Sequence, residues 1–254
     1  PARASLVSSL SPYVQPAPYD PTSSLYFAPP SYTKQSVSKR GTHHSTPLAG
    51  LIRSSLASGL ISRQEIVSCI PVIHLSVLPS HTCLDLCASP GSKTVQLLEL
   101  SSALVVANDV HPLRAASLSD AVGRALLPPP SLSGLVQTVH DGCEFPASAF
   151  PRFDRVLVDA PCSGSGTIRK DPTILPRWSP LTSNSLHATQ VALAMRGMRC
   201  LKVGGKMAYS TCSFNPVEDE AVVAEVLRRA EEEGGEVVVE EWDEGKMPGF
   251  RRRR

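Results

Sequence analysis

The stretch CLDLCASPGSKT, residues 83–94, joins an apolar run to a loop of small residues and then to the start of a helix. Its first part, residues 83–87, predicts a buried strand, and residues 92–100 predict a helix. The small residues between them let a ligand approach the backbone, and the first turn of the helix presents free N–H groups. The stretch therefore predicts a ligand-binding turn from a strand into a helix.

Strands and helices alternate along the chain after this turn. Further strands are predicted at residues 104–110, 134–140, 155–159 and 206–210, and further helices at 111–127, 185–201 and 218–229. This order predicts an α/β fold with a parallel, doubly wound sheet, helices on both faces and right-handed crossovers. In such sheets ligands bind beyond the carboxyl ends of the strands, and each unusual motif of this sequence follows a strand.

The composition is that of a folded chain with balanced charge. Of the 254 residues, 42% are hydrophobic, and 25 Lys and Arg stand against 23 Asp and Glu, a net charge of +2. This balance excludes a strongly basic nucleic-acid coat. No run approaches the roughly 18 apolar residues of a membrane span, and no secretory signal is visible. We therefore expect an intracellular chain whose seven cysteines are free thiols.

Composition and charge divide the chain into three segments. Residues 1–60 hold 13 Ser and 8 Pro, which predicts a largely irregular segment with a helix starting within 47–60. Residues 61–230 carry the alternating strands and helices. Residues 231–254 form a charged tail that ends in four arginines, either a solvated basic end or a truncation point. One folded domain is thus expected at 61–230.

The loop after the first strand has the character of a nucleotide-type cofactor site without strong phosphate contacts. Neither G-x-x-x-x-G-K-[ST] nor a full G-x-G-x-x-G is present. Asp109 follows the next strand, 18 residues after Gly91, where such folds hold ribose hydroxyls; a helix N-cap is the alternative. Asp141 either lines the same cleft or is a turn residue before Gly142. Together these residues predict an adenosine-containing cofactor such as S-adenosylmethionine (SAM).

Two cysteines follow the fourth and fifth predicted strands. Cys162 lies in DAPCSGSGT, residues 159–167, and Cys212 in YSTCS, residues 209–213. Loops of small and polar residues would expose both thiols beside the cofactor cleft, and a thiolate with a lowered pKa is a strong nucleophile. Three basic residues are candidate neighbours: Lys93, Arg169 and Lys170.

Packing is the alternative role for any cysteine. We expect it for four of them: Cys69, Cys83, Cys143 and Cys200. Zinc is disfavoured, because the spacing of Cys83 and Cys87 and the distant pair of Cys162 and Cys212 supply neither two C-x₂-C hooks nor a Cys/His set. No metal site is therefore expected.

Three segments, residues 85–94, 159–178 and 204–223, resemble the motifs of the Sun/Fmu (RsmB-like) RNA cytosine-5 methyltransferases. The resemblance covers roughly residues 61–223. The sequences ISRQE, ANDV and YSTCS, with Asn215-Pro216 and Glu218-Asp219-Glu220, bring it nearest to the eukaryotic tRNA branch. Ser89 stands where Ala is commoner in the family, and residues 1–60 show no motif of the family's N-terminal RNA-binding region.

The resemblance implies a Rossmann-like, SAM-dependent methyltransferase. It implies that Cys212 attacks carbon 6 of cytosine and that Cys162 assists release of the enzyme. It also implies a set of SAM contacts: Cys87, Ala88, Ser89, Pro90, Gly91, Ser92, Lys93, Asp109, Asp141 and Asp159. Asp159 would contact the cytosine ring edge or the cofactor, and Lys93 would stabilise the charge of the base.

RNA, and tRNA in particular, is the implied partner, in the nucleus or nucleolus. Arg169 and Lys170 beside Trp178 would suit RNA contacts, and a solvated loop with a core Trp is the alternative. Two other functions stay open: a SAM-binding RNA adaptor with weak or no catalysis, and an rRNA-directed methyltransferase. A DNA cytosine methyltransferase is disfavoured, because those enzymes use the Cys of a Pro-Cys motif as nucleophile and lack the Thr-Cys motif. The sequence predicts no oligomeric state.

Overall fold

The structure, a computed structural model of the chain, describes residues 15–16, 26–27, 47–58, 60–61, 64–125 and 134–241. Most of the Ser/Pro-rich segment 1–60 and the four terminal arginines lie outside the described residues. Helix α3, Pro47–Ala57, confirms the helix expected within 47–60. Two short strands, β1 (Gln15–Pro16) and β2 (Tyr26–Phe27), pair antiparallel with each other.

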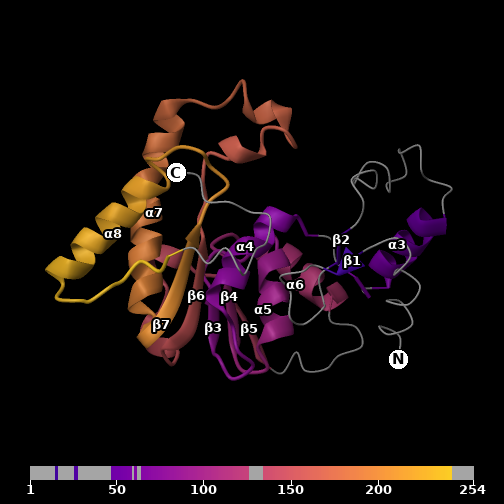
Figure 1. Cartoon of the computed structure of the whole chain (residues 1–254), viewed down its shortest axis with the longest axis horizontal. Helices are drawn as coiled ribbons and strands as arrows, with labels where there is room; N and C mark the ends of the chain where they lie inside the picture. Colours follow the sequence, from indigo (N-terminus) through magenta and orange to yellow (C-terminus); the bar gives the residue numbers. More distant parts are fainter. Residues whose placement is uncertain are drawn as a thin grey trace.

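A five-stranded parallel sheet with the order β5-β4-β3-β6-β7 forms the centre of the fold (Figure 1). Its strands are β3 (Cys83–Asp85), β4 (Val105–Asn108), β5 (Leu135–Thr138), β6 (Phe153–Asp159) and β7 (Leu201–Ser210). The chain runs outward from β3 to β5 and then returns to β6 on the other side of β3. The strand order therefore reverses between β3 and β6, where a doubly wound sheet opens its ligand crevice.

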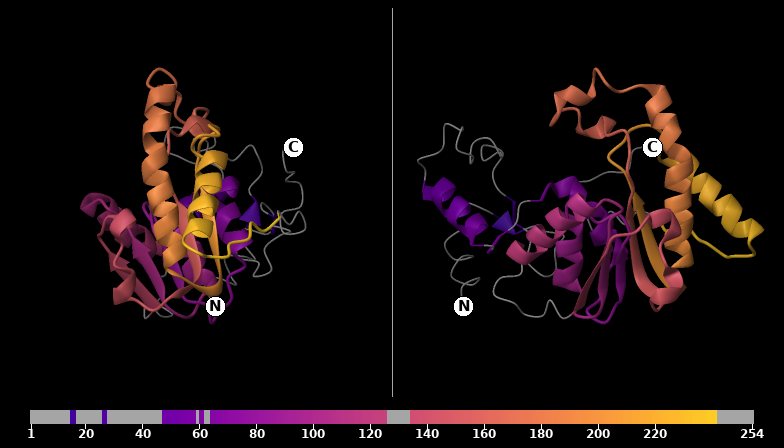
Figure 2. Two further views of the ribbon diagram at one scale, coloured as in Figure 1. Left: turned by 90° about the vertical axis from the view of Figure 1, so that its left-hand side faces the viewer. Right: turned by 180° about the vertical axis from the view of Figure 1, so that it is seen from behind.

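Helices and short 3₁₀ turns connect these strands. The α-helices that follow α3 are α4 (Ile66–Leu75), α5 (Ser92–Leu100), α6 (Pro112–Ala125), α7 (Pro180–Arg199) and α8 (Glu220–Glu232). The 3₁₀ turns are η2 (Gly142–Glu144), η3 (Ala147–Ala149), η4 (Ser165–Thr167) and η5 (Pro172–Ile174). Segments η4 and η5 and the start of α7 project beyond the sheet (Figure 2). Among the helices of the described residues, none has the length and hydropathy of a membrane span.

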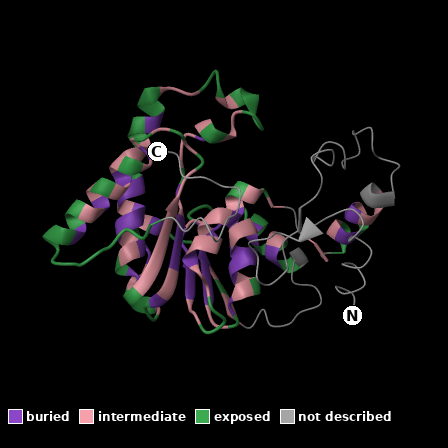
Figure 3. Cartoon of the chain, in the orientation of Figure 1, coloured by how far each residue is buried: buried purple, intermediate pink, exposed green. Residues whose placement is uncertain are grey.

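Successive residues of the buried strands face opposite helix layers, as the two-residue period of a strand requires. On one face, α4 and α5 pack against Cys83, Val105 and Leu157. On the other face, Leu193 of α7 packs against Leu84, Val106, Val156 and Val158. Figure 3 shows buried residues concentrated in the sheet and along α7. Both faces of the sheet are thus covered, which confirms the predicted fold class.

The predicted elements are confirmed, with ends that differ by up to five residues. Helix α5 has its predicted bounds. Helix α7 starts five residues early, because the Ser179 hydroxyl accepts a hydrogen bond from the Thr182 N–H and Pro180 occupies the first turn. Strand β7 also starts five residues early, at Leu201, and runs through Gly204 and Gly205 with an irregular register against β6. Helix α4 was not predicted, because Pro71 lies inside it.

Two helical glycines allow a matched test of this packing. A Cβ at Gly197 of α7 would lie 2.7 Å from Val158 Cγ2 of β6, whereas a Cβ at Gly123 of α6 would meet nothing within 4 Å. We predict that Gly197→Ala lowers the free energy of unfolding by about 1–3 kcal/mol through overpacking. Gly123→Ala should raise it by up to about 1 kcal/mol through helix propensity. Urea denaturation followed by circular dichroism measures both, and a stabilised Gly197→Ala variant would contradict the packing of α7 on β6.

Candidate active site

A pocket lies where the strand order reverses, between the loops that follow β3 and β6. Its lining residues are Asp85, Cys87, Ala88, Ser89, Pro90, Ser92, Lys93 and Asp159. The structure therefore brings most of the predicted cofactor loop together with two of the four predicted charged residues, Lys93 and Asp159. Asp109, Asp141 and Gly91 are not among the lining residues, and their contact with a cofactor stays a prediction.

Gly91 is required by the turn into α5. Its φ is +105°, in the region that favours glycine, and a Cβ there would lie 2.7 Å from Leu118 Cδ1 of α6. The loop can thus pass between the sheet and α6 only with a glycine at this position.

Asp109 fixes the other side of the same loop. Its carboxylate is buried, accepts hydrogen bonds from the N–H of Ser89 at 3.2 Å and of His111 at 3.0 Å, and lies 3.3 Å from the Arg114 guanidinium. Asp141 accepts a hydrogen bond from the N–H of Cys143 at 2.9 Å and starts η2. Both residues thus serve as caps or turn residues in this structure, the alternatives that their sequence positions also allowed.

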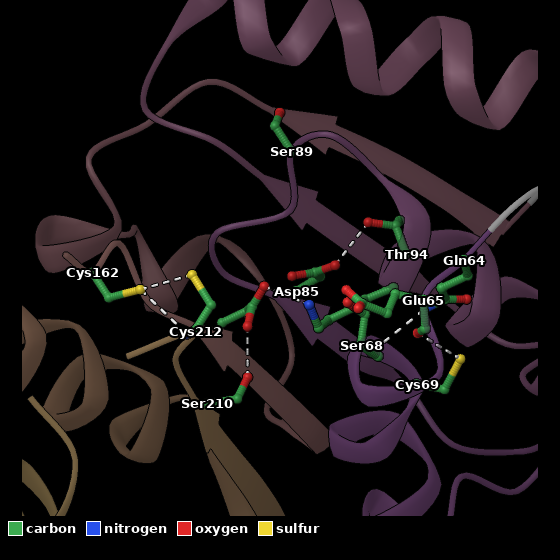
Figure 4. Close-up of polar contacts among 12 residues, drawn as sticks. Gln64, Glu65, Ser68, Cys69, Asp85, Ser89, Thr94, Cys162, Ser210 and Cys212 are labelled. Carbon is green, nitrogen blue, oxygen red and sulfur yellow. Dashed lines mark hydrogen bonds and ion pairs between the residues drawn. The ribbon is translucent and has the colours of Figure 1, made fainter. Parts of the chain in front are cut away.

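Two buried polar atoms of pocket-lining residues have no hydrogen-bond partner in the structure. Asp85 accepts a hydrogen bond from the Thr94 hydroxyl at 2.7 Å through Oδ2, but its Oδ1 has no partner, and neither has the Ser89 hydroxyl (Figure 4). Burial raises the pKa of Asp85 to about 7. Unpaired buried polar atoms cost free energy, so these two atoms suit a ligand that brings its own polar groups. Asp85 was not among the predicted site residues; its one signal in the sequence is an acidic residue inside a buried strand.

An ion pair connects the pocket to the last strands of the sheet. Lys93 Nζ lies 2.6 Å from Asp159 Oδ2, and Asp159 Oδ1 accepts a hydrogen bond from the Ser210 hydroxyl at 2.7 Å. Because Asp159 ends β6 and Ser210 ends β7, the pair joins α5, β6 and β7 at one edge of the sheet. The predicted neighbours Lys93 and Asp159 are thus in direct contact.

The two predicted cysteines are also in direct contact. Their sulfur atoms lie 3.1 Å apart, and the N–H of Cys212 donates a hydrogen bond to Cys162 Sγ at 3.2 Å. The sulfurs face each other in Figure 4. The hydrogen bond from Cys162 lowers the pKa of Cys212 to about 7, against the opposing effect of burial, and the charge of Lys93 adds to the lowering. The same contact raises the pKa of Cys162.

The remaining cysteines differ from this pair. Burial raises the pKa of Cys83 to about 12 and that of Cys143 to about 11, and it also raises the pKa of Cys200. None of the seven cysteines forms a disulfide bond. Near neutral pH, Cys212 therefore has a larger thiolate fraction than Cys83, Cys143 or Cys200. The described residues contain no group of three or more His, Cys, Asp or Glu side chains that could hold a metal ion.

Two basic residues of the segment before α7, Lys170 and Arg177, have partners other than the thiols. Lys170 pairs with Glu65, at the start of α4. Arg177 donates hydrogen bonds to the carbonyl and the hydroxyl of Thr173, both at 2.9 Å. Trp178 is half-buried, and its indole N–H is buried without a partner. Of the three predicted basic neighbours of the cysteines, Lys93 is the one whose charge is among the main causes that shift the pKa of Cys212.

Comparison with known proteins assigns the chain to a family. The 16S rRNA methyltransferase RsmB/F family matches residues 72–250 of the chain. The chain is 43% identical over 190 residues to a multisite-specific tRNA:(cytosine-C(5))-methyltransferase of Saccharomyces cerevisiae, covering 68% of this chain and 27% of that protein. It is 40% identical over 169 residues to the ribosomal RNA small subunit methyltransferase F of Vibrio cholerae, covering 65% and 35%.

A solved structure agrees with this result. The fold is similar to that of a methyltransferase homologue from Pyrococcus horikoshii, with a TM-score of 0.63 and 25% identity over 89% of this chain and 66% of that one. The chain spans 26–32% of the length of three curated tRNA cytosine-C(5)-methyltransferases that it matches. The match to the family covers more than half of the chain and includes both cysteine loops. The chain therefore belongs to the RsmB/F family of RNA methyltransferases, as the Sun/Fmu motifs predict.

Proposed function

We propose that residues 61–230 form the catalytic domain of a SAM-dependent RNA cytosine-5 methyltransferase that acts through a covalent adduct between Cys212 and cytosine. The observation that carries this proposal is the 3.1 Å contact between the sulfurs of Cys162 and Cys212. This contact lies beside the Lys93–Asp159 ion pair, and that pair borders the pocket. The thiol pair of Cys162 and Cys212 and the ion pair of Lys93 and Asp159 thus lie next to each other at the pocket.

The chemistry of cytosine explains why a thiolate is needed. Carbon 5 is too poor a nucleophile to accept a methyl group directly. When the Cys212 sulfur bonds to carbon 6, carbon 5 becomes enamine-like and nucleophilic, so one difficult step is split into two easier ones. SAM, when bound, supplies an electrophilic methyl group.

Release of the product requires a proton acceptor. A base must remove the carbon 5 proton, after which the electrons of that bond restore the ring and the bond between Cys212 and carbon 6 breaks. The 3.1 Å contact between the sulfurs of Cys162 and Cys212 supports a role for Cys162 in this step. Lys93 and Asp159 would orient the cytosine ring and balance the charge that develops on it.

The pocket residues fit SAM. Asp85 Oδ1 and the Ser89 hydroxyl are buried and without partners, which suits a ligand with its own donors and acceptors. Two carboxylates, Asp85 and Asp159, line the pocket and would balance the positive charges of a sulfonium and an ammonium group. The loop has no phosphate-binding motif, which agrees with a cofactor that carries no phosphate.

We propose tRNA as the substrate on the strength of the curated tRNA methyltransferases that the chain matches at 38–43% identity. Phe214, two residues after Cys212, is 80% exposed, and Arg169 and Arg177 are exposed on the projecting segment. Exposed aromatic and basic side chains suit an unstacked base and its backbone. An rRNA substrate is the second candidate, supported by the 40% identity to methyltransferase F. A nuclear or nucleolar location stays a prediction, which imaging of the tagged full-length protein would test.

Substitution of the two cysteines tests the proposal. We predict that Cys212→Ala reduces methylation of a tRNA transcript by labelled SAM to background and forms no covalent protein–RNA complex. Cys162→Ala should instead accumulate that complex, because release is impaired. Cys143→Ala, a half-buried thiol outside the pair, is the matched control and should retain activity. Methylation by Cys212→Ala would refute the assignment of the nucleophile.

The pKa of Cys212 gives a prediction for pH dependence. Only the thiolate reacts with iodoacetamide, so a lowered pKa moves the alkylation profile to lower pH. Peptide mass spectrometry should find half-maximal alkylation of Cys212 near pH 7. In Cys162→Ala this midpoint should rise, because the hydrogen bond that favours the Cys212 thiolate is gone. An identical midpoint in the two proteins would contradict the role assigned to the contact.

Asp85 tests the cofactor site. We predict that Asp85→Asn weakens SAM binding by about 10–100-fold, since a hydrogen bond to a charged group is worth about 1.5–3 kcal/mol. Asp120→Asn, on the exposed side of α6, should bind as the unmodified chain does. Isothermal titration calorimetry measures both. Unchanged affinity of Asp85→Asn would show that the unpaired oxygen does not face the cofactor.

A further inference from the structure

Glu218 is a buried carboxylate for which the proposed chemistry has no use. It lies six residues after Cys212 and two residues before the start of α8, and its exposed fraction is 0%. A buried charge is costly unless hydrogen bonds compensate it. The hydrogen-bond partners of Glu218 therefore indicate its structural role.

Both oxygens of Glu218 accept hydrogen bonds from several segments. Oε1 accepts from the N–H of Ser163 at 2.8 Å and from Gln190 Nε2 at 3.1 Å. Oε2 accepts from three hydroxyls, those of Ser163, Ser183 and Ser213, each at 2.5 Å. Ser163 follows Cys162 and Ser213 follows Cys212, whereas the other two residues belong to α7. One carboxylate therefore connects both cysteine loops to the same helix.

Direct hydrogen bonds between the Cys162 and Cys212 loops complete this arrangement. The N–H of Gly166 donates to the carbonyl of Cys212 at 2.8 Å, and the N–H of Phe214 donates to the Ser165 hydroxyl at 2.8 Å. The hydroxyls of Ser163 and Ser213 lie 3.2 Å apart. Since all these contacts lie within a few residues of the two sulfurs, the position of one loop relative to the other sets the distance between the sulfurs.

The charge of Glu218 is held by its donors. Burial alone would raise its pKa, but the hydrogen bonds from Ser163, Ser183 and Ser213 hold the pKa at about 2. The carboxylate is therefore ionised at neutral pH and keeps the three hydroxyls pointing inward. Hydrogen bonds to an ionised acceptor are about twice as strong as neutral ones.

We propose that Glu218 is a positioning residue that holds the Cys162 and Cys212 loops together, so that the two sulfurs stay in contact. The catalytic meaning of this role rests on the proposed function, whereas the geometry does not. Glu218 touches neither sulfur and acts only through Ser163 and Ser213.

Replacement by Gln is the sharpest variant. The amide keeps the volume of Glu218, so it leaves no cavity, but it has one acceptor oxygen and no charge. Its NH₂ group must face either the two N–H donors or the three hydroxyls. In the first case donors face donors, and in the second case the hydroxyls must rotate to accept hydrogen bonds. Glu218→Gln thus weakens the connection between the loops while preserving the packing. Glu220→Gln is the matched control, because Glu220 is exposed and lies two residues away.

The test measures the contact between the sulfurs in the full chain, without RNA or SAM. Diamide oxidises two neighbouring thiols to a disulfide and is itself reduced to the hydrazine, taking up the two protons and two electrons. Mass spectrometry of peptides gives the rate at which Cys162 and Cys212 are cross-linked. We expect Glu218→Gln to slow this rate at least tenfold and to raise the pH of half-maximal Cys212 alkylation by about one unit. Glu220→Gln should match the unmodified chain in both measurements.

Each outcome decides the proposal. A folded Glu218→Gln variant with unchanged cross-linking and alkylation overturns it. If circular dichroism shows that this variant does not fold, Ser213→Ala takes its place, because it removes one donor and leaves the carboxylate. Ser213→Ala should slow cross-linking about threefold, and an unchanged rate overturns the proposal. Failure of the proposed function would appear separately, as methylation by Cys212→Ala.

Discussion

The parallel pairing of β6 with β7 is the constraint on which the site depends. Asp159 and Ser210 are register partners at the carboxyl ends of these strands, and the N–H of Ala160 donates to the carbonyl of Ser210 at 2.8 Å. Cys162 and Cys212 follow these ends by three and two residues, so the register brings two thiols that are 50 residues apart in the chain to a distance of 3.1 Å. A shift of one residue would also turn every side chain of β7 to the opposite face.

The second neighbour of β6 supplies the rest of the site. Because β3 pairs with β6 on its other side, the loop that starts α5 lies beside Asp159, and Lys93 reaches across to it. The cofactor pocket, the ion pair and the thiol pair thus lie side by side along the carboxyl edge of the sheet. The pocket is next to β3, the ion pair is at the end of β6, and the thiol pair lies beyond the ends of β6 and β7. The reversal of strand order between β3 and β6 leaves room for the pocket there. Topology and register together arrange residues from three separate segments: the β3–α5 loop and the segments that follow β6 and β7.

Much of this arrangement could be predicted from local sequence. The apolar run before CASPGSKT and the small residues of the loop predict the β3–α5 turn, and small residues after two other strands mark Cys162 and Cys212. What escaped prediction depends on partners that are distant in the chain. Glu218 resembles an exposed residue at the start of a helix, and its burial is stabilised by donors from three other segments. In the sequence, Asp85 resembles any acidic residue at a strand end. Only the structure shows that one of its carboxylate oxygens is buried without a hydrogen-bond partner.

The most direct measurement of the central claim identifies the atom that bonds to the base. In RNA that contains 5-fluorocytosine, the fluorine at carbon 5 cannot leave as a proton does, so the adduct persists after methyl transfer. Digestion and mass spectrometry of the trapped complex should find the methylated fluorocytidine on the peptide that contains Cys212. An adduct on Cys162, or no adduct on either cysteine while natural cytosine is still methylated, would contradict the assignment of Cys212 as the nucleophile.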